Sequence, residues 1–204
     1  MTQGSTAKPT VYIVDDDQSI RHAMEFLMRS VGIDYAIFHS GDDFLGKYSN
    51  ELAGCLLLDI RMPGLGGLEL QDKLIEMGST LPIIFITGHG DVPMAVEAMQ
   101  KGAVDFIQKP FRDQELLDRI GTAMQADRER RSERRLKDNV QARISKLTKR
   151  EKEVLDLVVT GKPNKVIAYE LGVSQRTVEI HRARVMEKMQ ARSLADLVKM
   201  RMDD

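Results

Sequence analysis

Short apolar runs alternate with stretches of helical period through the first 125 residues, and this alternation restricts the possible folds of the chain. The runs cover residues 11–14, 35–38, 55–58, 82–86 and 103–107. Stripes of helical spacing between them are Ile20, Ala23, Met24, Leu27 and Val31, and Leu68, Leu70, Leu74, Ile75 and Met77. Strands that alternate with helices predict an α/β domain, with a doubly wound parallel sheet and helices on both faces.

The remaining 79 residues show only helical signals. Residues 113–145 read as one long helix whose middle is polar all round, which is typical of a solvated connector. After it, Thr148 and Glu151 have the spacing of a capping box. Asn164 and Ser174 are expected to cap two further helices. With a closing apolar helix, the sequence predicts a second, all-α domain of four helices.

Charge is distributed unevenly along the 204 residues. Residues 1–125 carry 10 basic and 18 acidic side chains, residues 126–147 carry 8 and 4, and residues 148–204 carry 12 and 9. The basic part hints at a nucleic-acid partner. No apolar stretch is long enough for a membrane span, and no secretion signal is evident. The single cysteine, Cys55, is expected to be buried, which fits a cytoplasmic protein.

Polar side chains follow four of the five expected strands. Asp15 and Asp16 follow the first, Asp59 and Thr87 end the third and fourth, and Lys109 follows the fifth. Ligands of a doubly wound sheet bind outside the carboxyl ends of its strands, so we expect these groups to converge. Three carboxylates in one crevice predict a Mg²⁺ site. An aspartate there can accept a phosphoryl group, whose charge the metal and the lysine would balance.

Plainer interpretations of these residues stay open at this point. Asp17 is expected to be the N-cap of the next helix, and Asp91 stands at a later helix start. Helix capping is the alternative for Asp15 and Asp16 as well. Lys109 stands before a proline, where an ordinary loop lysine is also common.

Residues 10–124 resemble a two-component receiver domain. The motifs that carry the resemblance are Asp15-Asp16, Asp59 in LLLDIRMPG, Thr87 in FITGHGD, and Phe106 and Lys109-Pro110 in VDFIQKPF. Successive spacings from Asp16 through Asp59 and Thr87 to Lys109 are 43, 28 and 22 residues. The resemblance implies a flavodoxin-like (βα)5 fold with strand order 2-1-3-4-5.

The resemblance also implies roles for these side chains. Asp59 would be the phosphoacceptor, and Mg²⁺ would be held by Asp16, Asp59 and the Arg61 carbonyl, with Asp15 acting through water. Thr87, Lys109 and Phe106 would bind the phosphoryl group or respond to it, and the Lys109–Pro110 bond would be cis. A face formed by the fourth helix and fifth strand would dimerise through Val92, Val96 and Met99.

Residues 164–183 have the layout of a helix-turn-helix motif, whose second helix enters the major groove. Its expected core residues are Ala168, Leu171, Val173, Val178 and Val185. The expected DNA contacts are Lys165, Arg176, Thr177, Glu179, Ile180, His181, Arg182, Ala183 and Arg184. Basic and hydroxyl side chains suit phosphates, whereas Glu179, Ile180 and Ala183 are expected to meet base edges. A helical interaction module with a solvated basic face is the alternative.

The segment 147–200 resembles the LuxR-type DNA-binding domain, and the whole chain resembles the FixJ-type response regulators. The implied organisation is a receiver at 10–124, a helical linker at 125–143 and a DNA-binding domain at 144–204. The implied function is a transcription regulator activated by phosphorylation of Asp59. Its implied partners are a sensor histidine kinase, promoter DNA, RNA polymerase and a second copy of the chain.

Two rival functions share part of this pattern. An aspartyl-phosphate phosphatase would use the same aspartate, metal and lysine, but it usually carries a D-x-D motif, and DIR at 59–61 lacks the second aspartate. A phosphorylation-independent regulator would keep the fold as a binding module, and the complete acidic set argues against that. We therefore expect a regulator rather than an enzyme that turns over a substrate.

Overall fold

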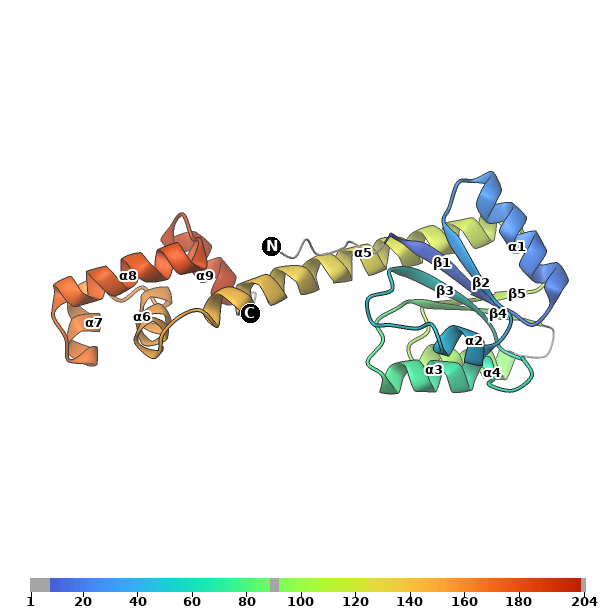
Figure 1. Cartoon of the computed structure of the whole chain (residues 1–204), viewed down its shortest axis with the longest axis horizontal. Helices are drawn as coiled ribbons and strands as arrows, with labels where there is room; N and C mark the ends of the chain where they lie inside the picture. Colours follow the sequence, from blue (N-terminus) through green and yellow to red (C-terminus); the bar gives the residue numbers. More distant parts are fainter. Residues whose placement is uncertain (1–7, 89–91, 203–204) are drawn as a thin grey trace. The chain divides into compact units, whose positions relative to one another are not determined.

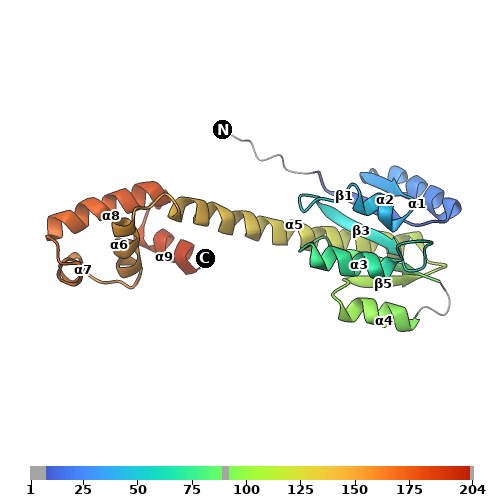
Figure 2. The same cartoon turned by 60° about the horizontal axis from the view of Figure 1, so that its bottom comes forward.

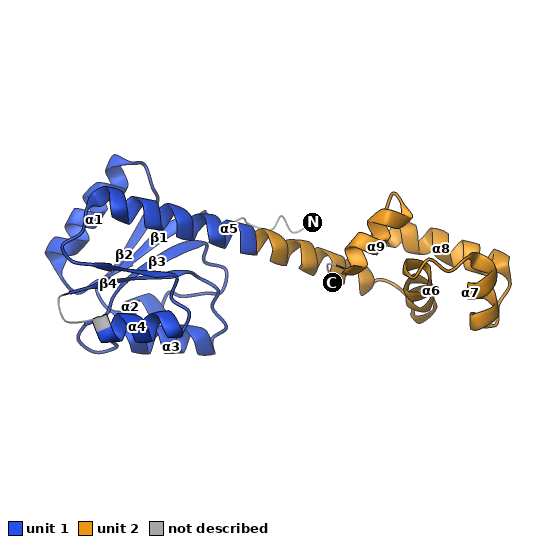
Figure 3. Cartoon of the chain, turned by 180° about the vertical axis from the view of Figure 1, so that it is seen from behind, with its two compact units in different colours: residues 1–130 blue, residues 131–204 orange. Residues whose placement is uncertain are grey.

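The structure is a computed structural model of the 204-residue chain, and it describes residues 8–88 and 92–202. The chain divides into two compact units, residues 1–130 and 131–204 (Figure 3). The expected helix cap at Asp91 and the side chain of Val92 lie outside the described residues. Within the described ranges, no helix is both long and apolar enough to cross a membrane.

The first unit is built on a parallel sheet of five strands. They are β1 (Thr10–Val14), β2 (Tyr35–Phe38), β3 (Gly54–Asp59), β4 (Ile83–Thr87) and β5 (Asp105–Gln108). The strand order is β2-β1-β3-β4-β5, as predicted. The fifth strand begins two residues later than the apolar run at 103–107 suggests, because Ala103 N still donates to the Ala98 carbonyl oxygen of α4.

Helices cover both faces of the sheet (Figures 1 and 2). The helices of this unit are α1 (Gln18–Ser30), α2 (Gly41–Leu45), α3 (Gly67–Glu76), α4 (Val92–Gln100) and the start of α5 (Asp113–Ile144). Successive side chains of a strand point to opposite faces. Tyr12 and Val14 therefore pack with α2, α3 and α4, whereas Val11 and Ile13 pack with α1 and α5.

Most local predictions for this unit are confirmed, but one apolar stripe is partly wrong. Asp17 caps α1 by accepting a hydrogen bond from Ser19 N at 2.7 Å, and Cys55 is fully buried. Burial raises the pKa of the Cys55 thiol to about 12. The apolar stripe assigned to α3 is too broad, because Ile75 and Met77 lie on its solvent side and are exposed.

The second unit is a helical domain with its own core. It contains the end of α5 together with α6 (Lys149–Val159), α7 (Asn164–Leu171), α8 (Gln175–Met189) and α9 (Leu194–Met202). Its core residues include Val154, Ile167, Val178, Val185 and Leu197. Val140 and Ile144 from the last turns of α5 pack against this core.

The starts and stops of these helices follow from local chemistry. Thr148 and Glu151 form the predicted capping box at α6, and Ser174 caps α8 by accepting from Thr177 N. Gly172 ends α7 with φ 65°, in the left-handed region that favours glycine. The prediction that Asn164 caps α7 is wrong. Pro163 holds that position, and Asn164 is the first residue of the helix.

Candidate functional site

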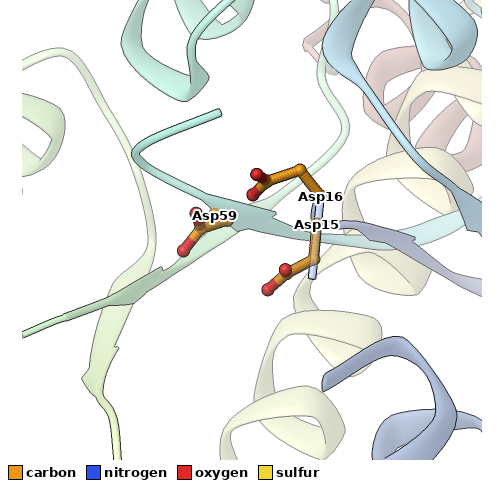
Figure 4. A group of neighbouring side chains, drawn as sticks. All are labelled: Asp15, Asp16 and Asp59. Atoms are coloured by element: carbon orange, nitrogen blue, oxygen red, sulfur yellow. The ribbon is translucent and has the colours of Figure 1, made fainter. Parts of the chain in front are cut away.

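Three aspartates meet at the carboxyl edge of the sheet. Asp15 and Asp16 follow β1, and Asp59 ends β3, the neighbouring strand. One carboxylate oxygen from each residue lies within 4.8 Å of the others, and Figure 4 shows the carboxyl groups gathered at one place. Asp15 and Asp59 are buried, while Asp16 is exposed. The predicted convergence of the strand ends is therefore seen for all three aspartates.

Asp15 is held in place by hydrogen bonds on three of its oxygens. Its Oδ1 accepts from Asp17 N at 2.8 Å, and its Oδ2 accepts from Lys109 Nζ at 2.8 Å. Its carbonyl oxygen accepts from Arg21 Nη1 at 2.7 Å. Because each carboxylate oxygen accepts a hydrogen bond from the protein, the orientation of the Asp15 side chain is fixed.

Lys109 joins two of the carboxylates. Its Nζ donates to Asp59 Oδ1 at 3.0 Å as well as to Asp15. Burial lowers the pKa of Lys109, but the two hydrogen bonds outweigh this effect and raise it. For Asp59, burial raises the pKa and the contact with Lys109 lowers it, and the net pKa is raised. The ammonium group is thus fixed beside Asp59, where a transferred anion would need a cation.

The donor set fits a hard divalent cation. Three ionised carboxylates and one lysine leave a charge of about −2 in the crevice, and carboxylate oxygens are the ligands that Mg²⁺ prefers. The exposed position of Asp16 leaves its carboxylate accessible from solvent. The chemistry of these residues therefore suits magnesium better than a softer metal, for which thiol or imidazole ligands would be expected.

The other predicted receiver residues lie on β4, on β5 and in the segments that follow β3 and β5. Thr87 is buried at the end of β4, and its carbonyl accepts from Lys109 N at 2.7 Å. Phe106 is half-buried in β5 beside Phe85. The Lys109–Pro110 bond is cis, as the resemblance implies. Arg61 lies exposed two residues after Asp59.

One glycine lets the start of α3 pack closely against the backbone of Asp59. A Cβ atom on Gly67 would lie 2.2 Å from the Asp59 carbonyl oxygen, so no larger residue fits there without moving the backbone. Gly67 N also donates to the carbonyl of Ile60 at 2.9 Å. The start of α3 is therefore packed directly against the end of β3.

The second candidate site is the outward side of α8. Arg176, Glu179, Ile180, Ala183 and Arg184 are exposed, as the helix-turn-helix interpretation expects. Val178 and Val185 lie on the opposite, buried side. Lys165 is exposed on α7, the first helix of the motif.

Three of the side chains expected to contact DNA are hydrogen-bonded or partly buried within the domain. Arg182 Nη1 donates to Asn164 Oδ1 at 3.0 Å, which joins α8 to the start of α7. The Thr177 hydroxyl lies 2.8 Å from that of Ser174. His181 is half-buried, and its Nδ1 is buried without a hydrogen-bond partner among the described residues. These three side chains are less free to reach a ligand than their exposed neighbours.

The apolar residues assigned to a dimer face are only partly described. Val96 and Met99 are exposed on α4. Val104, which precedes β5, is exposed as well and was not predicted.

Comparisons with known proteins match both units. Residues 11–121 match the family described as response regulator receiver domain, and residues 145–201 match the luxR family of bacterial regulatory proteins. Nodulation protein W of Bradyrhizobium diazoefficiens is 49% identical over 98% of this chain and 87% of its own length. Transcriptional regulatory protein FixJ of the same organism is 43% identical over 97% of this chain and 96% of its own.

A solved structure of the response regulator StyR aligns over 97% of this chain and 100% of its own, with a TM-score of 0.91 and 46% identity. FixJ is named as a transcriptional regulatory protein and StyR as a response regulator, not as enzymes, which sets aside the phosphatase alternative. The chain therefore belongs to the response regulators of the FixJ type, in which a receiver domain is joined to a LuxR-type DNA-binding domain.

Proposed function

We propose that this protein is a cytoplasmic transcription regulator that is switched by phosphorylation of Asp59. The observation that carries the proposal is the contact of Lys109 with both Asp59 and Asp15 inside a crevice of three carboxylates. A carboxylate oxygen of Asp59 attacks the phosphorus of a phosphohistidine on a sensor kinase. The new O–P bond forms as the P–N bond breaks, and the imidazole leaves with the electron pair.

The other residues of the site are assigned to metal binding, to phosphoryl binding and to the conformational response. Asp16, Asp59 and the Arg61 carbonyl would hold Mg²⁺, with Asp15 acting through water, and the ion would supply positive charge beside the phosphoryl oxygens. Lys109 pairs with the transferred group. The hydroxyl of Thr87 donates to a phosphoryl oxygen, and the ring of Phe106 repacks as Thr87 moves. These roles rest on the family resemblance and on the positions of the side chains.

The output of the switch is dimerisation and DNA binding. We assign the dimer contacts to Val92, Val96 and Met99, because the last two expose apolar surface on α4. The α8 helix of each of the two copies then binds in the major groove of a promoter. The proposed DNA contacts are Lys165 and the predicted residues 176, 177 and 179–184. RNA polymerase is the expected downstream partner. The proposed boundaries are 10–124, 125–143 and 144–204, with the helix-turn-helix at about 164–183.

The metal assignment is tested by comparing two adjacent aspartates. We expect Asp16→Asn to raise the Mg²⁺ concentration needed for half-maximal binding of beryllofluoride, a phosphoryl mimic, by about tenfold or more. Asp17→Asn is the matched control, because Asp17 is also exposed but caps α1. Calorimetric titration at fixed beryllofluoride measures both. Equal Mg²⁺ requirements in the two variants would contradict the assignment.

The dimerisation step is tested on the unmodified chain by its mass in solution. Light scattering after gel filtration should show a monomer without ligands and a dimer with Mg²⁺ plus beryllofluoride. Val96→Glu should stay monomeric under both conditions, because a carboxylate in an apolar contact is costly. Ile75→Glu, an equally exposed apolar position on α3, should dimerise normally. A dimeric Val96→Glu variant would place the contact elsewhere.

The DNA interface is tested through its salt dependence. Arg176→Ala should weaken binding to duplexes of any sequence and reduce the slope of log K against log salt by about 1, because one phosphate contact is lost. Lys152→Ala, an exposed lysine on α6 outside the motif, serves as the control. Fluorescence anisotropy with a labelled random-sequence duplex measures both slopes. An unchanged slope in Arg176→Ala would remove Arg176 from the interface.

A further inference from the structure

A carboxylate continues the buried stripe of α5. Leu116, Ile120 and Ala123 pack onto the sheet at helical spacing, and the next buried residue is Asp127, whose exposed fraction is 2%. A charged group in such a position is costly unless it is hydrogen-bonded. Asp127 lies beyond residues 11–121, which match the receiver family, so the resemblance does not explain it. Its role must come from what it contacts.

Asp127 contacts the start of the strand that ends in Asp59. Its Oδ2 accepts a hydrogen bond from Gly54 N at 2.9 Å, and Gly54 is the first residue of β3. Gly54 has φ 122°, and a Cβ there would lie 1.9 Å from the Thr10 carbonyl oxygen of β1. Only glycine fits this close approach of the two strands. The carboxylate therefore binds a backbone position that has little freedom to move.

A second contact lies one helical turn further along α5. Arg130 Nη1 donates to the Thr80 carbonyl oxygen at 2.7 Å, and Thr80 precedes β4. Both contacts lie at the amino edge of the sheet, opposite the edge that carries the three aspartates. They fasten the turn from residue 127 to residue 130 to the first unit, which ends at Arg130.

We propose that Asp127 is a positioning residue that couples the linker helix to β3, and through this strand to Asp59. The inference rests on the proposed function of Asp59. Because the Asp127–Gly54 hydrogen bond joins α5 to the first residue of β3, its loss would release this turn of α5 from the strand. Coupling between two sites is reciprocal, so a ligand at Asp59 changes the attachment by the same factor by which the attachment changes the ligand's affinity.

The test uses the full-length chain and two readouts. The first is the hydrogen-exchange rate of the Gly54 amide, with and without Mg²⁺ plus beryllofluoride. The second is the affinity for beryllofluoride at saturating Mg²⁺. Asp127→Leu keeps an apolar stripe and removes the acceptor, and Asp127→Asn keeps the shape and removes the charge. Glu129→Gln is the matched control, an exposed carboxylate changed to an amide on the same helix.

We expect Asp127→Leu to speed exchange at Gly54 by roughly tenfold, the effect of losing one hydrogen bond to a charged group. Its affinity for beryllofluoride should differ from that of the unmodified chain by about fivefold, with Asp127→Asn shifted less in the same direction. Glu129→Gln should match the unmodified chain in both readouts. Faster exchange with unchanged affinity would make Asp127 a stability contact and overturn the coupling.

If Asp127→Leu does not fold, the test rests on Asp127→Asn. An exchange rate and an affinity equal to those of the unmodified chain would then overturn the proposal. A different result would contradict the proposed function itself. If the unmodified chain does not bind beryllofluoride, the phosphorylation switch is absent, and the coupling falls with it. Binding in the unmodified chain with no shift in the variants rejects only the coupling.

Discussion

Asp59→Asn takes up no covalent phosphate from acetyl phosphate and Mg²⁺, whereas the unmodified chain becomes phosphorylated. This is the expected result, because an amide oxygen carries no charge and is a poor nucleophile compared with a carboxylate. The substitution changes one atom of a side chain that lies in contact with Lys109. The mass of the intact protein before and after incubation measures the uptake. Asp17→Asn, which alters only a helix cap, should be phosphorylated normally.

Phosphorylation of Asp59→Asn to the level of the unmodified chain would mean that another residue is the acceptor. The same variant has a second expected effect, on stability. The folded-state pKa of Asp59 is raised, chiefly by burial, so its contribution to stability is largest below the unfolded pKa of 3.8 and is lost as the pH rises through the folded pKa. Asp59→Asn should therefore melt higher than the unmodified chain at pH 7 in metal-free buffer. That difference should shrink toward pH 4.

Glu151→Ala should destabilise the second unit by about 2 kcal/mol. The Glu151 side chain is 2% exposed, and its Oε2 accepts from Lys188 Nζ at 2.5 Å and from Thr148 N at 2.8 Å. The substitution removes a buried carboxylate, leaves Lys188, a third of whose side chain is exposed, without this partner, and removes the cap of α6. Urea unfolding of the full-length chain, followed through amide signals of α6 and α8, measures the change.

The control for this prediction is Glu153→Ala. Glu153 pairs with Arg150 near the surface, where about a third of each side chain is exposed, so its loss should cost less than about 1 kcal/mol. The double variant with Lys188→Met should recover part of the stability lost in Glu151→Ala, because the unpaired ammonium is removed. A loss in Glu151→Ala no larger than that in Glu153→Ala would show that the buried pair does not stabilise this unit.

The pH dependence of this pair has a definite sign. The hydrogen bond from Lys188 lowers the pKa of Glu151 from 4.5 to about 2. A carboxyl group whose folded pKa is depressed contributes stability above its unfolded pKa and loses it as the pH falls through the folded value. The second unit should therefore lose stability between about pH 4.5 and pH 2, and Glu151→Ala should lose less over that interval.

Local patterns in the sequence were sufficient to predict the order and type of the helices and strands. The apolar runs became five parallel strands because each run is short, continuous and bounded by residues that start helices. Thr148 and Ser174 cap helices through contacts with residues three positions along, which is a spacing that a sequence displays directly. Asp15, Asp16 and Asp59 came together because parallel strands place their carboxyl ends on one edge.

The sequence by itself determined the two-unit organisation, the strand alternation, the caps of α1, α6 and α8 and the residues of the acidic crevice. Only the tertiary structure decided which charged groups pair. Lys109 binds a partner 94 residues away and another 50 away, Asp127 binds one 73 residues away, and Glu151 binds one 37 away. No periodic pattern in the sequence encodes such contacts, because they depend on how the elements pack. Packing also decides which charged groups are buried, and a buried charge is costly unless it has a partner.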